Sequence, residues 1–303
     1  MPLQIGNTSI SKIYIGSTDI PKAYLGTVQV FPDAIPITDF DFYTAVDLWF
    51  TNQSLAEATW GLIGNWNVSS VTNMSEAFYI YRSGGSATNT FNEDISAWDT
   101  SSVTDMSYMF NRALAFNADI GSWDVSNVTS MNSTFANTSA FNQPLNWDAS
   151  SVTTMSQMFQ SATAFNSALT FDTSSVTDMS NMFNSATAFN QPLNFSDTSN
   201  VLYMQFMFLQ VTAFNQPLIW DVSSVLYMQN MFNSVTLSTT NYDLILVAWE
   251  AYLQTAFPSG VGYTKNIFVS FNTTQYTAGS AAATARTSLI NNFGWTITDG
   301  GSI

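Results

Sequence analysis

The chain has 303 residues, 46% of them apolar and only 9% charged, so it holds enough apolar side chains for a large core. Six Lys and Arg stand against 21 Asp and Glu, and the net charge of −15 argues against nucleic acid or anionic membrane surfaces as partners. The absence of Cys and His removes thiol nucleophiles, the histidine base and the usual zinc ligands. These exclusions favour a non-enzymatic protein without a cofactor.

No stretch of the sequence is apolar enough to predict membrane insertion. The longest strongly apolar run, residues 244–249, is far shorter than the roughly 20 residues of a spanning helix. Residues 1–20 also lack the basic and apolar regions of a secretion signal. We therefore expect a soluble protein made without an export signal.

Residues 1–31 carry a short repeat with a period of ten. Gly6, Gly16 and Gly26 mark turns between alternating apolar and polar residues, which predicts short β-strands. So small a module cannot hold a core alone. We expect it to anchor the chain on its own repeats, on identical copies or on another protein. The candidate anchoring residues are Ile5, Ile13, Tyr14, Ile15, Ile20, Tyr24 and Leu25.

Residues 32–65 are predicted to be a linker followed by a helix that caps the repeats. Thr38 is a candidate N-cap, with Asp41 at the third helical position. A repeat array needs such a cap because its first core layer would otherwise face water. The apolar face of this helix consists of Phe42, Val46, Trp49 and Phe50.

One motif recurs seven times over residues 66–236, with a spacing of 24 or 25 residues after a longer first unit. Its consensus reads W-D-x-S-S-V-T-x-M-S-x-M-F-x-x-A-T-A-F-N-x-P-L-x. Because one unit cannot bury its own apolar columns, we expect the units to stack as a solenoid with a continuous core. The units start at Trp66, Trp98, Trp123, Trp147, Phe171, Phe195 and Trp220.

Each unit is predicted to contain short strands and a short helix. Strands are expected around residues 144–147 and 152–155, and Met155, Phe159 and Ala162 have the spacing of about one helical turn. The fold class is therefore α+β.

Two polar residues recur once in most units and so form columns along the stack. An Asn after the second Phe predicts an asparagine ladder at a turn, with ligand binding by the amides as the alternative. An Asp after the first aromatic residue predicts a turn cap, with calcium binding as the alternative. The columns are Asn92, Asn117, Asn142, Asn166, Asn190 and Asn215, and Asp99, Asp124, Asp148, Asp172 and Asp221.

Residues 237–303 are predicted to be an α/β cap. We expect helices over 241–256 and 281–291 and strands over 267–271 and 295–298. Arg286 is interpreted as a structural partner for a carboxylate or carbonyl, with a ligand clamp as the alternative. The first helix is expected to turn Ile245, Trp249, Tyr252 and Leu253 inward.

The repeat departs from its consensus at two surfaces that could bind a partner. In the last two units the polar residues after the conserved Val become apolar, which is typical of interfaces, unless the C-terminal cap covers them. The first unit carries an insertion with Tyr79, Tyr81 and Arg82, either a contact loop or a passive one. The apolar substitutions are Leu202, Tyr203, Phe206, Leu226 and Tyr227.

The motif WDVSNVTSM at 123–131 and FNQPL at 141–145, 189–193 and 214–218 closely resemble the BspA-like leucine-rich-repeat family of bacterial surface proteins and related phage proteins. The resemblance covers about residues 60–236, and the segment after it resembles the closing segment of such repeats. It implies a leucine-rich-repeat-like solenoid used for adhesion or protein contact, with no catalytic residues.

The first thirty residues resemble N-terminal segments of bacteriophage structural proteins. This resemblance implies a virion protein made in the host cytoplasm, such as a head fibre, decoration or tail component, that contacts other virion proteins or itself as a homotrimer. A host surface protein or glycan is the expected target of the solenoid. The alternatives are a bacterial cell-surface adhesin and a carbohydrate-active β-solenoid, although the regular Asp columns argue against a catalytic carboxylate pair.

Overall fold

The computed structural model describes residues 36–79 and 90–303, together with the backbone of six short strands in the first 35 residues. The strands form three separate antiparallel hairpins, which confirms the predicted ten-residue strand repeat. They are β1 (Leu3–Ile5) with β2 (Thr8–Ile10), β3 (Ile13–Ile15) with β4 (Thr18–Ile20), and β5 (Tyr24–Leu25) with β6 (Val28–Gln29).

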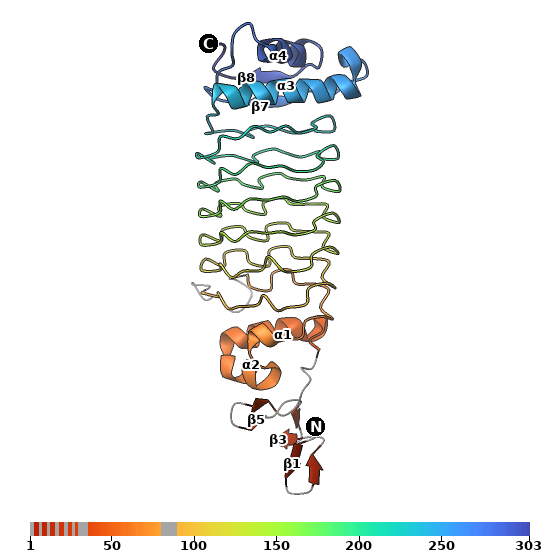
Figure 1. The fold of residues 1–303 in the computed structure, drawn as a ribbon, viewed down its shortest axis with the longest axis vertical. Coiled ribbons are helices and arrows are strands. Elements are labelled where there is room, and N and C mark those ends of the chain that lie inside the picture. Colours follow the sequence, from red (N-terminus) through yellow and green to blue (C-terminus); the bar gives the residue numbers. More distant parts are fainter. Residues whose placement is uncertain are drawn as a thin grey trace.

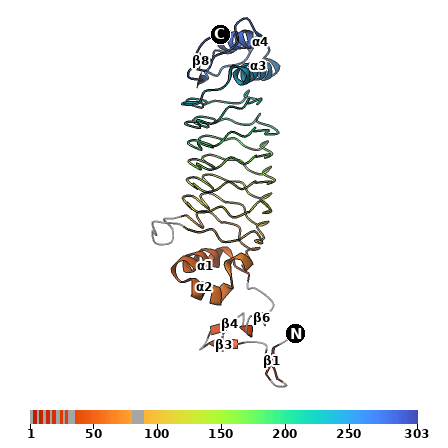
Figure 2. The same ribbon diagram turned by 60° about the vertical axis from the view of Figure 1, so that its left-hand side comes forward.

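The repeats lie one above another as a stack of coils between two helical ends (Figure 1). Single parallel bridges join equivalent positions of successive units, as in Thr154 with Asp178. Backbone N–H groups also donate to the next coil, for example Met155 N to Asp178 O at 2.9 Å and Phe159 N to Met182 O at 2.8 Å. Figure 2 shows the same regular layering from a second side.

The predicted helix inside each coil is wrong. Residues 155–162 form consecutive turns, and the predicted strands reduce to single bridges at Leu145 and Thr154. Gln157 and Ser161 have positive φ values of 59° and 56°, which interrupts any helix within the turn.

These left-handed residues direct their N–H groups to the next coil. Gln157 N donates to Ser180 O at 2.9 Å, and Ser161 N donates to Asn184 O at 2.7 Å. A helix would have used the same donors within its own unit. Pairing between coils therefore replaces helical pairing inside the coil.

Two columns of phenylalanine rings fill the core along the stack. Phe135 and Phe159, in successive coils, have ring centroids 5.6 Å apart and planes within 8°. Inside one coil, Phe159 lies 4.0 Å from Phe165 of the second column. The rings thus pack both along and across the stack, which is how units that have no core of their own come to share one.

The predicted asparagine ladder is confirmed. Asn166 N donates to Asn142 Oδ1 at 2.7 Å, and Asn190 N donates to Asn166 Oδ1 at 2.9 Å. The pattern runs from Asn92 to Asn215, whose Oδ1 accepts from Ser238 N at the start of the C-terminal cap. Each amide therefore satisfies the turn backbone of the following coil.

The N-terminal cap contains α1 (Asp39–Thr51), α2 (Gln53–Trp60) and the 3₁₀ turn η1 (Ile63–Asn65). Thr38 is the N-cap of α1, as predicted, but its hydroxyl donates to Asp41 Oδ2 instead of accepting from a helix N–H group. The helix α2 was not predicted; Asn52 starts it by accepting from Leu55 N at 3.2 Å. Phe42 and Val46 are buried against the first coil.

A single carboxylate joins α1 to the first coil. In later coils, the backbone N–H of the column threonine donates to the preceding threonine carbonyl, as Thr104 N does to Thr72 O. Thr72 has no preceding coil, and its N–H donates to Asp39 Oδ1 at 2.7 Å while its hydroxyl donates to Oδ2 at 2.6 Å. Asp39 therefore takes the place of the missing carbonyl.

The C-terminal cap contains α3 (Thr239–Ala256), the 3₁₀ turn η2 (Pro258–Gly260), β7 (Phe268–Ser270), α4 (Ala281–Asn291) and β8 (Thr296–Thr298), and β7 pairs with β8 in parallel. The predicted helices and strands are confirmed within two residues. Ile245, Trp249 and Leu253 are buried, but Tyr252 is 38% exposed, so its predicted inward position is wrong. Tyr252 lies off the stripe of every fourth residue that the other three share.

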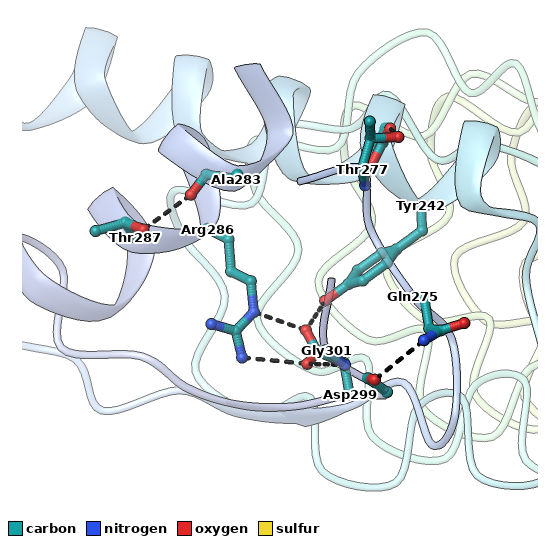
Figure 3. A network of polar contacts seen from close by, with 10 residues as sticks. Tyr242, Gln275, Thr277, Ala283, Arg286, Thr287, Asp299 and Gly301 are labelled. Carbon is teal, nitrogen blue, oxygen red and sulfur yellow. Dashed lines mark hydrogen bonds and ion pairs between the residues drawn. The ribbon is translucent and has the colours of Figure 1, made fainter. Parts of the chain in front are cut away.

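An ion pair joins α4 to the chain after β8 (Figure 3). Arg286 Nε donates to Asp299 Oδ2 at 2.7 Å, and the Asp299 side chain is only 3% exposed. Tyr242 of α3 donates to the same oxygen at 2.7 Å, and both burial and this carboxylate raise the pKa of Tyr242. The predicted structural role of Arg286 is confirmed.

Replacing Asn166 with Ala should lower the free energy of unfolding by about 1 kcal/mol, because it leaves the part-buried Asn190 N–H without its acceptor. Urea denaturation measures the change. The matched control is Asn146→Ala, since Asn146 is exposed and its side chain makes no hydrogen bond within the described residues. Equal effects of the two substitutions would contradict the ladder's contribution.

Replacing Arg286 with Met should cost about 3 kcal/mol of stability, because the buried Asp299 carboxylate loses its counter-charge. The same substitution in an Asp299→Asn background should cost much less. Thermal and urea unfolding of the four variants of this cycle measure the coupling. Additive effects would contradict the role of the ion pair.

Candidate functional site on the polar wall

One wall of the stack carries a column of threonines that hydrogen-bond from coil to coil. The Thr153 hydroxyl donates to Thr129 O at 3.1 Å, and the Thr177 hydroxyl donates to Thr153 O at 3.2 Å. In the last two coils the column continues as Leu202 and Leu226, whose N–H groups keep the backbone ladder. Leucine has no hydroxyl and cannot make this bond between coils. The fold therefore does not require leucine at these two positions.

The adjacent column changes in the same two coils. Its members Ser130, Thr154 and Asp178 are polar, and the bridges continue from Asp178 to Tyr203 and Tyr227. The two tyrosine rings stack with centroids 5.8 Å apart and planes within 8°. Tyr227 is 50% exposed, which leaves an aromatic surface open to a partner.

Phe206 extends this surface from an unfavourable backbone conformation. Its φ is 61°, in a column where Gln157, Asn181 and Asn230 also have positive φ. Asn tolerates the left-handed region far better than a bulky aromatic residue does. Tyr108, with a φ of 58°, is a second aromatic residue in this column, so the half-buried Phe206 departs from the Asn of the two neighbouring coils and not from a rule of the whole repeat.

The structure brings together four of the five predicted residues, Leu202, Tyr203, Leu226 and Tyr227, and places Phe206 three residues after Tyr203 in the same coil; we call the five the wall patch. Leu226 N donates to Leu202 O at 2.9 Å, and the tyrosines stack beside them. Leu226 and Tyr227, in the coil next to the C-terminal cap, remain 39% and 50% exposed. The cap therefore does not cover the patch, contrary to the alternative interpretation.

The remaining predicted contact residues lie at or beyond the edges of the described residues. Tyr79 is half-buried at the start of the insertion, whereas Tyr81 and Arg82 lie outside the described residues. The anchoring candidates from Ile5 to Leu25 lie on the N-terminal strands, whose side chains are also outside the described part. Their roles stay predictions.

The Asp column caps turns, as predicted. Asp124 Oδ1 accepts from the Ser126 hydroxyl at 2.7 Å and from its N–H at 3.0 Å, and Asp172 Oδ1 accepts from Ser174 N at 3.0 Å. Hydrogen bonds from these serines hold the pKa of Asp124 and of Asp172 below 3.8. Each carboxylate therefore contributes to stability above its ordinary pKa, and that contribution is lost as the pH falls through the lowered value.

Residues 36–79 and 90–303 contain no group of three or more acidic side chains placed to hold a metal ion. The same described ranges contain no helix with the length and apolar character of a membrane span. Calcium along the Asp column stays an untested alternative.

Ile219 is 50% exposed and was not among the predicted contact residues. It follows Leu218 in a column whose other members include Asn146, Thr170 and Asn194. A single exposed Ile is ordinary on a protein surface. Only a comparison within its column shows that it is an exception.

Replacing Phe206 with Asn, the residue at the equivalent position of the two neighbouring coils, should raise the free energy of unfolding by up to about 1 kcal/mol, because Asn relieves the left-handed strain. The reverse change Asn181→Phe, one coil earlier, is the matched control and should lower it. Changing the other four patch residues to Thr should leave the melting temperature unchanged within a few degrees. A large drop in the melting temperature of these variants would show that the wall patch belongs to the hydrophobic core.

Two overlapping segments of the chain, residues 44–169 and 145–245, match a family model described as "Mycoplasma protein of unknown function, DUF285". Together the two segments span all seven coils and the start of α3. No curated protein matches the chain. Because the matched segments cover more than half of its residues, the chain belongs to this DUF285 family.

Proposed function

We propose that this chain is a non-enzymatic structural and adhesion component of a bacteriophage particle, built as a leucine-rich-repeat-like solenoid. Residues 1–31 anchor the chain on the particle or on identical copies, and the coils display a binding wall. The likeness of the first thirty residues to phage structural proteins supports the virion location. The likeness of the repeats to BspA-like proteins supports the display role.

The wall patch is the observation that carries the display role. Two features of the repeat are absent from it, the threonine hydroxyl bonds and the polar bridge column, and Phe206 replaces the Asn that the two neighbouring coils have at this left-handed position. Each change removes a favourable or neutral local choice and adds exposed apolar surface. Interfaces are enriched in aromatic side chains such as tyrosine and phenylalanine, and a few buried residues of this kind contribute most of the binding free energy.

A bacterial cell-surface adhesin of the BspA-like type is the second candidate. The repeat motif favours it as strongly as it favours a phage protein, whereas the N-terminal hairpin repeat favours the phage. A carbohydrate-active enzyme is the weakest candidate, because the column aspartates are engaged in equivalent turn bonds in successive coils. A catalytic pair would need local exceptions among them.

The proposal is tested by purifying phage particles from the bacterium that produces this chain and quantifying the chain by mass spectrometry. We expect it in the particles at a fixed copy number. Its presence on the cell surface and absence from particles would overturn the proposal in favour of the adhesin.

Particles assembled with either of two variant chains then distinguish the anchoring role of residues 1–31 from the display role of the wall patch. Deletion of residues 1–31 should abolish incorporation, while the five patch substitutions should leave incorporation intact and reduce attachment to host cells at least tenfold. Unchanged incorporation after the deletion would contradict the anchoring role.

A further inference from the structure

A hollow of about 400 Å³ lies between the segment where the fifth coil passes into the sixth and the segment where the sixth passes into the seventh, and each segment precedes the wall-patch residues of the coil it leads into. Its lining comes from residues 192–195 of the first segment and residues 216–220 of the second. Pro192 and Pro217, at equivalent positions of the two coils, line it with rigid rings. The hollow is therefore formed by two FNQPL motifs and the residues that follow each of them.

Two buried aromatic rings form the floor of the hollow, and the exposed Ile219 supplies accessible apolar surface beside them. The Trp220 indole donates to Leu193 O at 3.2 Å and stacks on Phe195, with ring centroids 5.5 Å apart and planes within 17°. Phe195 stands where five of the seven units have Trp, and it is 8% exposed, more than any of those tryptophans. Ile219 extends this surface outward at the rim.

The polar part of the hollow is a pair of amides. Asn194 is exposed, and its side chain makes no hydrogen bond within the described residues. Gln216 donates through Nε2 to Asn190 O at 3.0 Å and to Asn190 Oδ1 at 3.1 Å, which fixes the side chain and leaves its Oε1 as an acceptor. The hollow thus offers donors and acceptors beside an apolar surface, the usual composition of a ligand site.

None of the residues that line the hollow is ionisable. An anionic ligand would be repelled by a chain of net charge −15, and a cationic ligand would meet no counter-charge among these residues. The ligand that fits is uncharged, has one apolar face and carries hydroxyl groups around its edge. A hexopyranose ring has this chemistry, with C–H groups on one face and hydroxyls around the ring.

We propose that this hollow binds a neutral hexose unit of a surface glycan. The C–H face of the sugar packs against the exposed Ile219, over the edge of Phe195, while its hydroxyls donate to Gln216 Oε1 and exchange hydrogen bonds with the Asn194 amide. This assignment deepens the proposed display function and rests on it: the wall patch contacts protein, and the hollow adds sugar recognition in the same region of the stack.

The test applies the full chain to a printed array of neutral, sialylated and uronic-acid oligosaccharides, followed by NMR titration with the methyl glycosides of neutral hexoses. We expect binding to neutral glycans only. Asn194→Ala and Ile219→Thr should weaken it at least tenfold. The matched control Asn146→Ala, in the same column two coils earlier, should bind as the unchanged chain does.

Three results would overturn the proposal: no binding of any neutral glycan at millimolar concentration, equal binding of acidic glycans, or equal affinities of Asn194→Ala and Asn146→Ala. Incorporation of the Asn194→Ala chain into particles is measured in parallel. If no glycan binds but the chain is still incorporated into particles, only this proposal is refuted. If the chain is absent from particles, the proposed function is refuted.

Discussion

Backbone pairing between neighbouring coils is the constraint on which the rest of the molecule depends. Each coil donates N–H groups in both directions: Thr177 N donates to the preceding coil at Thr153 O, and Met179 N donates to the following coil at Tyr203 O. A unit outside the stack would leave these groups unpaired and its phenylalanines exposed. The same pairing fixes the left-handed residues, since their N–H groups are aimed along the stack. Side chains that point outward escape the constraint, and there the sequence is free to vary.

The two ends satisfy this constraint by different means. At the first coil, the Asp39 carboxylate accepts the Thr72 N–H and hydroxyl that later coils give to a threonine carbonyl. At the other end, Asn215 Oδ1 of the sixth coil accepts from Ser238 N, so the asparagine ladder ends on the N-cap of α3. At the first coil, the Asp39 carboxylate replaces the missing threonine carbonyl. At the other end, the first residues of α3 replace a missing coil. Both helices also cover the core layer beneath them.

The sequence periodicity predicted the side-chain columns that stacking requires. It failed where one residue spacing is compatible with two local structures. The aromatic columns and the asparagine ladder follow from repeated apolar and Asn positions; outside the repeat, α1, α3 and α4 were predicted and α2 was not. The spacing of Met155, Phe159 and Ala162 fits a helical turn and also fits two successive turns that bury the same side chains. Glycine at these positions would have indicated positive φ values, but Gln157 and Ser161 adopt them instead. Their hydrogen bonds between coils compensate for the strain. Ile219 was missed because its exposure is ordinary and only its column is unusual.

The exceptions to the repeat gather in one region, and this placement bears on how a display protein would work. The wall patch and the hollow both fall within residues 192–227, in the coils that adjoin the C-terminal cap. Residues 1–31 belong to the opposite end of the chain, with α1, α2 and five coils between (Figure 1). A chain anchored through its first residues would hold the regular coils as a spacer and present the specialised ones far from the anchor. Specialisation next to the anchor would instead have suggested that the coils themselves dock onto the particle.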